Sequence, residues 1–140
     1  MSELRAPEMP WLAPYITLRD VEASIRFYTE IFGFELADKV DGPDGTPFHI
    51  EFRYHGEKVL MGTPDRPETG QCPATLGVRA SQWFYLYVDD VDDVMARAVA
   101  AGATVESPAE DAFWGDRMGI IVCPNGYRWS VARWRGAADS

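Results

Sequence analysis

The sequence repeats one pattern, and the two copies are offset by about 70 residues. A segment with the apolar spacing of an amphipathic helix begins at Asp20 and ends at Gly33, and a second one runs from Asp90 to Gly102. Each segment follows a short alternating run, PYITL at 14–18 and FYLYV at 84–88, and precedes further strand-like runs. A β-α-β-β-β unit this small cannot bury its own sheet face. We therefore predict an α+β fold of two tandem βαβββ modules that form a curved mixed sheet around a cleft.

A chain of 140 residues fits one domain built from two closely packed modules. We expect residues 12–62 to form module one and residues 82–134 to form module two. The segment 63–80, rich in Pro, Gly and Thr, is the expected linker, and residues 38–47 (DKVDGPDGTP) are expected to be a turn between strands. Asp20 is the expected N-cap of the first helix, and Gly33 is its expected stop.

Composition limits the compartment and the partners of the chain. The N-terminal segment MSELRAPEMPW lacks the basic and apolar regions of a signal peptide, so we expect a cytoplasmic protein. Cys72 and Cys123 form neither a disulfide framework nor a zinc motif, and we expect both to be thiols. The formal net charge of −9 argues against nucleic acid and anionic membranes as partners, whereas it permits a cationic ligand.

Strand alternation predicts which side chains point away from the helices. Trp83, Tyr85 and Tyr87 share one face of their run, and Phe84, Leu86 and Val88 share the other. By the same argument Tyr15 lies opposite Ile16 and Leu18. Tyr and Trp combine an apolar ring with a polar tip, which suits a surface that contacts a ligand. We therefore predict that Tyr15, Trp83 and Tyr85 line the cleft, whereas Trp129 is expected in the core.

Several motifs resemble those of the vicinal oxygen chelate superfamily. They are D-V-x-x-S-x-x-F-Y-x-x-x-F-G at 20–33, P-N-G-Y-R-W at 124–129 and F-W-G-D-R at 113–117. That superfamily includes glyoxalase I, extradiol dioxygenases, fosfomycin-modifying enzymes and bleomycin resistance proteins, and the last motif is similar to its PhnB-like or bleomycin-resistance-like branch. The resemblance implies the fold predicted above. It does not fix the chemistry, because one scaffold hosts many functions.

The resemblance also implies where a divalent metal would be held. The enzymes of the superfamily use His, Gln or Glu from the first and last strands of each module, and the corresponding positions here are Ala13, Leu60, Trp83 and Ser130. None of these side chains supplies the donors that such an ion needs. We therefore expect no metal and no cofactor, and a register error of one residue would bring in Met61 or Val131, which are no better donors.

Two further groups are candidates for ligand contact. His49 and Glu51 lie two residues apart and therefore share one strand face, and His55 follows beside a turn glycine. Polar residues at a solvent edge are the simpler interpretation; a functional role would be hydrogen bonding to a ligand. Trp114 lies in a loop and would either contact a ligand or plug the cleft as a hydrophobic lid.

These observations favour a metal-free binding protein that sequesters a small aromatic or cationic compound, with an antibiotic as the most specific version. The expected ligand-binding residues are Tyr15, His49, Glu51, Trp83, Tyr85, Trp114 and Ser130. Two alternatives remain: a metal-dependent lyase, isomerase or dioxygenase with relocated ligands such as His49 and Glu51, and an accessory protein without a small ligand. The resemblance further implies a homodimer in which a proline-containing arm, Met9-Pro10-Trp11, is exchanged between subunits.

Overall fold

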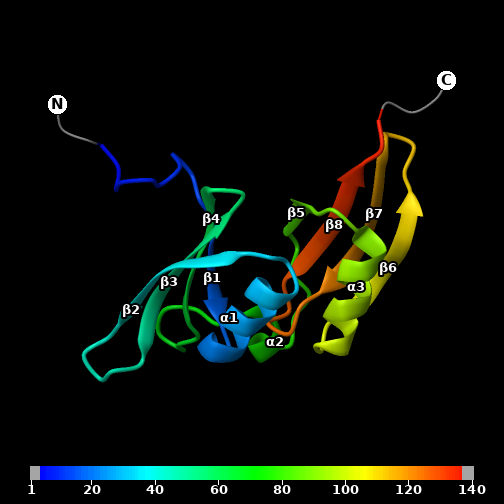
Figure 1. Cartoon of the computed structure of the whole chain (residues 1–140). Coiled ribbons are helices and arrows are strands. Elements are labelled where there is room, and N and C mark those ends of the chain that lie inside the picture. The colour runs from blue at the N-terminus through cyan, green and yellow to red at the C-terminus, as the bar shows by residue number, and fades with distance from the viewer. Residues whose placement is uncertain (1–3, 137–140) are drawn as a thin grey trace. The chain divides into compact units, whose positions relative to one another are not determined.

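The computed structural model describes residues 4–136 and divides the chain into two compact units, Met1–Cys72 and Pro73–Ser140 (Figure 1). Each unit contains a mixed four-stranded sheet and one ten-residue helix, so the predicted pair of βαβββ modules is confirmed. The boundary lies inside the predicted linker 63–80, although that segment also contains a short helix, α2 (Pro73–Leu76). Within residues 4–136, no helix is long and apolar enough to cross a bilayer.

The N-terminal unit follows the predicted order of elements. Its strands are arranged as β1-β4-β3-β2, with β1 parallel to β4 and the other pairs antiparallel. The elements are β1 (Tyr15–Leu18), α1 (Val21–Glu30), β2 (Glu35–Asp41), β3 (Pro47–Tyr54) and β4 (Glu57–Pro64). Helix α1 begins where the sequence predicts, because the carboxylate of Asp20 accepts a hydrogen bond from the backbone N–H of Ala23 at 3.0 Å.

An aromatic cluster forms the core of the N-terminal unit. Tyr28 of α1 is fully buried and packs edge to face against Phe52 of β3, with 5.7 Å between the ring centroids. Phe27, Phe32 and Phe34 complete the cluster. Because α1 covers one face of the sheet with these rings, the opposite face is left for polar and partly exposed side chains.

The C-terminal unit repeats this design with smaller core side chains. Its strand order is β5-β8-β7-β6, again with the first pair parallel. The elements are β5 (Trp83–Tyr87), α3 (Val91–Ala100), β6 (Thr104–Asp111), β7 (Asp116–Val122) and β8 (Arg128–Trp134). Trp129 is 3% exposed and its ring lies 4.7 Å from that of Phe84, which confirms its predicted place in the core. Gly119 leaves room for the side chain of Met95 from α3, since a Cβ would lie 2.5 Å from its sulfur.

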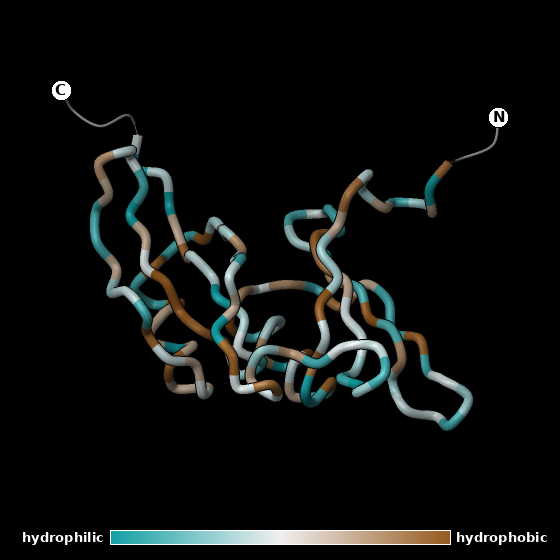
Figure 2. The backbone as a smooth tube through the Cα atoms, turned by 180° about the vertical axis from the view of Figure 1, so that it is seen from behind, coloured by the Kyte–Doolittle hydropathy of each residue, from teal (hydrophilic) through white to brown (hydrophobic). Residues whose placement is uncertain are grey.

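One local prediction was wrong in its boundaries. The predicted turn 38–47 includes the end of β2, which continues to Asp41. β2 is an exposed, polar edge strand without alternation, and its backbone pairing with β3 keeps it extended. Asp116 and Arg117 of the FWGDR motif are the first residues of β7. Figure 2 shows the turn of the β2–β3 hairpin in pale to hydrophilic colours, in keeping with its Gly, Pro, Asp and Thr residues.

Candidate functional site

An aromatic row follows one face of β5. Trp83, Tyr85 and Tyr87 are 46%, 44% and 50% exposed, whereas Leu86 between the two tyrosines is 8% exposed. The alternation predicted from the sequence is therefore confirmed for this strand. The outer faces of three neighbouring aromatic side chains form a surface on which a planar molecule can stack.

A buried carboxylate lies beneath part of this row. Asp116, at the start of β7, is 2% exposed, and its Oδ2 atom accepts hydrogen bonds from the hydroxyls of Tyr85 at 2.6 Å and Tyr87 at 3.0 Å. The indole N–H of Trp114 donates to the same oxygen over a longer distance, 3.3 Å. Within residues 4–136, the Oδ1 atom of Asp116 has no hydrogen-bond partner. The aromatic row and the FWGDR loop thus converge on one carboxylate.

The carboxylate changes the titration of the two phenols. Burial and the hydrogen bond to Asp116 raise the pKa of Tyr85 to about 12. The hydrogen bond to Asp116 also raises the pKa of Tyr87 above its ordinary value of 10.0, with a smaller contribution from burial. Both phenols are therefore neutral donors at physiological pH, and they direct their hydrogens toward Asp116.

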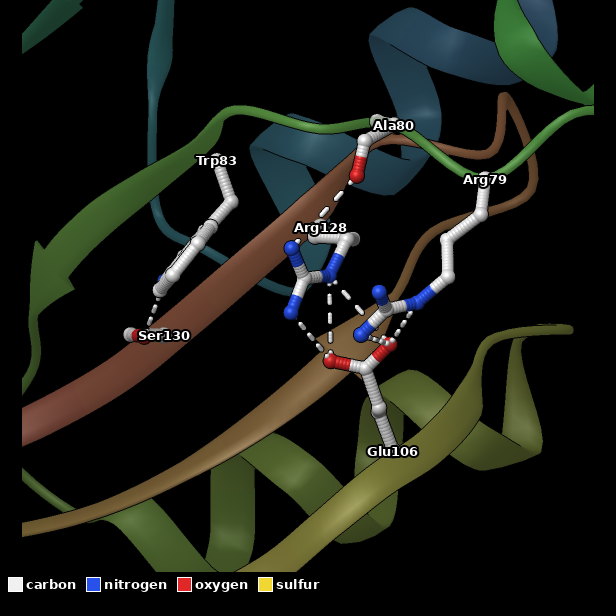
Figure 3. Close-up of polar contacts among 6 residues, drawn as sticks. All are labelled: Arg79, Ala80, Trp83, Glu106, Arg128 and Ser130. Atoms are coloured by element: carbon white, nitrogen blue, oxygen red, sulfur yellow. Dashed lines mark hydrogen bonds and ion pairs between the residues drawn. The ribbon is translucent and has the colours of Figure 1, made fainter.

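Trp83 is held on two sides (Figure 3). Its indole N–H donates to the hydroxyl of Ser130 at 2.9 Å, and the guanidinium of Arg128 lies 4.2 Å from its ring centroid. Arg128 is 6% exposed, and its two nitrogens Nη2 and Nε donate to Oε2 of Glu106 at 2.7 and 3.0 Å. Arg79 holds the other oxygen of Glu106 at 2.9 Å. This ion-pair network fixes the cation that supports the indole ring.

The network keeps Glu106 ionised. The hydrogen bond from Arg128 is the main cause that lowers the pKa of Glu106 below its ordinary value of 4.5, and Arg79 acts in the same direction against the opposing effect of burial. Arg128 is therefore paired with a full negative charge at neutral pH. Because both partners keep their charges, the support beneath Trp83 is stable over the physiological pH range.

A second group of predicted residues lies on the open face of the N-terminal sheet. The hydroxyl of Tyr15 is 2.6 Å from Nδ1 of His49, and Nε2 of His49 is 2.7 Å from Oε2 of Glu51. The other carboxylate oxygen of Glu51 is 2.8 Å from Nζ of Lys58. The structure thus brings Tyr15, His49 and Glu51 together in one line of hydrogen bonds. We name this line, with Lys58, the Tyr15 relay.

Two pKa values shift within the Tyr15 relay. Burial raises the pKa of Glu51, but hydrogen bonds from Lys58 and His49 outweigh this effect and bring it below its ordinary value of 4.5. Burial also raises the pKa of Tyr15 above 10.0, against the opposing effect of its contact with Thr63. Glu51 is therefore an anion and Tyr15 a neutral phenol at physiological pH.

The positions that would hold a metal in related enzymes do not fit one here. Trp83 and Ser130 hydrogen-bond to each other, and Leu60 lies in the core at 2% exposure. Met61, the register neighbour of Leu60, pairs with Tyr15, whereas the equivalent Tyr85 pairs with Ser130. Over residues 4–136, no three His, Cys, Asp or Glu side chains gather as a metal site would require.

The seven predicted ligand-binding residues therefore fall into two groups, one in each unit. Four main partners of these residues were not predicted as such from the sequence: Lys58, Glu106, Asp116 and Arg128. The alternation of β8 offered a signal for Arg128, because it shares a face with Ser130 two residues later. Asp116 is part of the FWGDR motif, but neither Asp116 nor Glu106 carried a signal for its partner, because strand pairing brings both to their partners.

Two surface hollows of the N-terminal unit lie elsewhere. One, of about 710 Å³, is lined by residues of the β2–β3 turn and by Asp20, Pro64 and Arg66. The other, of about 570 Å³, lies between residues 5–11 and the β3–β4 turn. Neither contains any of the seven predicted residues, and neither gathers groups with evident chemistry.

Comparison with known proteins defines the family. Residues 10–131 match the Glyoxalase/Bleomycin resistance protein/Dioxygenase superfamily. An uncharacterised protein of Mycobacterium bovis is 35% identical over 128 residues, which cover 89% of this chain and 83% of the relative. A glyoxalase-related enzyme from Fulvimarina pelagi is 26% identical, with a TM-score of 0.65 and coverage of 89% of this chain and 88% of that one. TioX from Micromonospora sp. ML1 is 26% identical, with a TM-score of 0.62 and coverage of 94% and 99%. The chain therefore belongs to the glyoxalase/bleomycin resistance protein/dioxygenase superfamily.

Proposed function

We propose that this protein is a metal-free binding protein that sequesters a small aromatic or cationic compound, as members of the bleomycin-resistance-like branch would. An antibiotic is the most specific version of such a ligand. The observation that carries the proposal is the support of Trp83, whose ring rests on Arg128 and whose edge is held by Ser130 while 46% of the residue stays exposed. A ligand would find this aromatic surface already ordered.

Order in the free protein matters because binding must otherwise restrict a mobile side chain. Fixing a side chain that rotates freely costs about 0.5–1.5 kcal/mol, and a ring held in advance avoids much of that cost. Aromatic stacking contributes about 0.5–1.5 kcal/mol for each pair beyond the area buried. Trp83 followed by Tyr85 and Tyr87 thus supports capture of a planar compound.

Charge favours one orientation of the ligand. Arg128 already lies against one face of Trp83, so a second cation on the opposite face would be repelled. Asp116 lies toward the other end of the row and has an oxygen with no partner among residues 4–136. We therefore expect the neutral ring system of the ligand over Trp83 and its amine near Asp116.

Trp114 is suited to move when such a ligand binds. Its indole N–H lies 3.3 Å from Asp116 Oδ2 and also 3.3 Å from the hydroxyl of Tyr85. The bond to Asp116 is longer than those that Tyr85 and Tyr87 donate to the same oxygen. The residue is 48% exposed in the turn between β6 and β7. Movement of this side chain would open access to Asp116 at little cost and would let its indole ring stack on the bound ligand, which favours the lid interpretation of the FWGDR loop.

Replacement of Trp83 or Trp114 by alanine should weaken binding of a planar amine such as 9-aminoacridine by about 1–3 kcal/mol, or roughly fivefold to 150-fold in Kd. Loss of stacking surface is the reason. Ligand fluorescence titration measures the affinity, and denaturant midpoints check that each variant is folded. Trp11→Ala is the matched control, because Trp11 also stacks on an arginine, Arg5 at 4.2 Å, yet lies outside the aromatic row. Equal affinities for Trp83→Ala and Trp11→Ala would contradict the proposal.

The alternative enzyme function requires a metal held by residues such as His49 and Glu51. Both side chains are already engaged with Tyr15 and Lys58, which does not favour that role. Elemental analysis of the purified protein separates the two functions. About one zinc, nickel, iron or manganese ion per chain, lost together with an activity on chelation, would favour the enzyme.

We also propose a homodimer that uses the N-terminal arm. Trp11 and Leu12 are 74% and 89% exposed, and such adjacent apolar side chains are typical of a contact surface. Light scattering at tens of micromolar should give twice the mass of the chain, and deletion of residues 1–11 should weaken the dimer. A monomeric mass for the full chain would contradict this proposal.

A further inference from the structure

The Tyr15 relay has the order of a nucleophile, a base and a residue that orients the base. Glu51 is ionised and accepts a hydrogen bond from Nε2–H of His49 at 2.7 Å. This contact assigns the proton of the neutral imidazole to Nε2 and leaves the lone pair of Nδ1 for the hydroxyl of Tyr15, 2.6 Å away. The same arrangement of a nucleophile, a base and an orienting residue activates hydroxyl nucleophiles on unrelated folds.

The exposed end of the relay is Tyr15. This residue is 50% exposed, whereas the side chains of His49 and Glu51 are 20% and 12% exposed. The side chain of Lys58 is also only 12% exposed, and it fixes the second oxygen of Glu51. A compound that approaches this face therefore meets the phenol first, while the proton acceptor behind it is shielded and held in place.

We propose that Tyr15 is a nucleophile that His49 activates as a general base, and that this site accepts acyl groups from activated esters. In the first step the phenol oxygen forms a bond to the acyl carbon, and its proton passes to Nδ1 of His49. The ester C–O bond then breaks, and the leaving group takes the proton from the imidazolium, which restores neutral His49. The product is an acyl-Tyr15 ester, and no oxidant, reductant or metal is consumed.

The chemistry of the phenol limits the substrate class. Burial raises the pKa of Tyr15, so the group is not ionised beforehand and needs His49 while the new bond forms. A tetrahedral intermediate expels the weaker base, and an ordinary alkoxide is a stronger base than a phenolate. Aryl esters and thioesters therefore transfer their acyl group to Tyr15, whereas alkyl esters do not.

Tyr85 and Tyr87 serve as internal controls for the reactivity of Tyr15. Tyr85 occupies the equivalent position 70 residues later and is 44% exposed, but its hydroxyl donates to the Asp116 carboxylate. A carboxylate is a far weaker base than an imidazole. Tyr87 has the same 50% exposure as Tyr15 and the same carboxylate partner. The three tyrosines thus differ mainly in the base behind the phenol.

The test treats the full chain with p-nitrophenyl acetate and locates the acetyl groups by peptide mass spectrometry. Base assistance contributes about 100-fold or more in enzymes, so Tyr15 should be acetylated at least about tenfold faster than Tyr85 or Tyr87. His49→Gln should remove this advantage, and imidazole added to the buffer should restore part of it. His55→Asn changes the only other histidine and should leave the rate unchanged.

Equal acetylation of Tyr15 and Tyr87 in the unaltered protein would overturn the proposal, and this comparison does not depend on whether any variant folds. A folded His49→Gln variant that is acetylated at Tyr15 as fast as the unaltered protein would overturn it as well. The proposal is independent of ligand capture at Trp83, since the relay lies entirely in the other unit. A result that refutes acyl transfer to Tyr15 therefore does not refute ligand capture at Trp83, and the reverse also holds.

Discussion

Replacing Arg128 by methionine should lower the free energy of unfolding by about 3 kcal/mol, because it leaves Glu106 without its main partner and removes the support of Trp83. Arg128 is 6% exposed and donates three hydrogen bonds to Glu106, at 2.7, 3.0 and 3.2 Å. Chemical denaturation at pH 7 measures the loss. The fluorescence of Trp83 should change in the same variant, since the cation no longer lies against its ring.

This loss should depend on pH in a defined direction. The pKa of Glu106 is lowered in the folded protein, chiefly by Arg128, so its contribution is complete above the ordinary value of 4.5. The contribution disappears as pH falls through the lowered folded-state pKa. The difference in stability between the unaltered protein and Arg128→Met should therefore be greatest near neutrality and should shrink in acid.

The double variant Arg128→Met with Glu106→Leu is the control for the ion pair. It removes both charges, so no carboxylate is left without its partner, and it should recover much of the stability that the single variant loses. A single variant as stable as the unaltered protein at pH 7 would contradict the role assigned to this network.

Alanine at Gly126 should destabilise the protein by about 3 kcal/mol or more, whereas alanine at the equivalent Gly56 should cost about 1–2 kcal/mol. Both glycines have positive φ angles, 90° and 81°. A Cβ at Gly126 would lie 2.5 Å from the backbone nitrogen of Ala74, which cannot move aside as a flexible side chain would, but a Cβ at Gly56 meets nothing within 4 Å.

The two glycine variants control for each other, because they share the backbone strain and differ in the steric overlap. Denaturation followed by far-ultraviolet circular dichroism gives the two losses under the same conditions. Equal losses would show that the contact between α2 and the turn before β8 does not restrict Gly126.

The repeat made the fold predictable, because the two copies carry the same helix caps and strand alternation. The pairing register between the first and last strands of each unit was harder to predict from the sequence. Tyr15 pairs with Met61, which is 46 residues later in the chain, whereas Tyr85 pairs with Ser130, which is 45 residues later. A fixed offset of 70 therefore equates Leu60 with Ser130, whereas pairing with the first strand equates Met61 with Ser130. A β-bulge between the Phe52–Leu60 and Arg53–Lys58 pairs shifts β4 by one residue, and β8 pairs with β7 without such a shift.

The exposed side chains of the candidate site were predictable, and their buried partners were not. Alternation along β5 placed Trp83 and Tyr85 on the open face. Tyr85 and Asp116 are 31 residues apart, and Arg128 and Glu106 are 22 residues apart. Their contacts depend on the registers of four strands, β5, β6, β7 and β8. A single sequence fixes which face a residue takes more readily than which distant residue it meets there.

The most direct test of ligand capture is a titration followed by the indole N–H signals of the five tryptophans in a proton–nitrogen NMR spectrum. The first ligand is 9-aminoacridine, and ethidium and proflavine follow as other planar cations. Phenylalanine variants of each tryptophan assign the signals. The proposed function predicts saturable shifts for Trp83 and Trp114, with Trp129 in the core and Trp11 in the arm unaffected. Saturable binding that moves neither Trp83 nor Trp114, or no saturable shift with any of the three compounds, would contradict it.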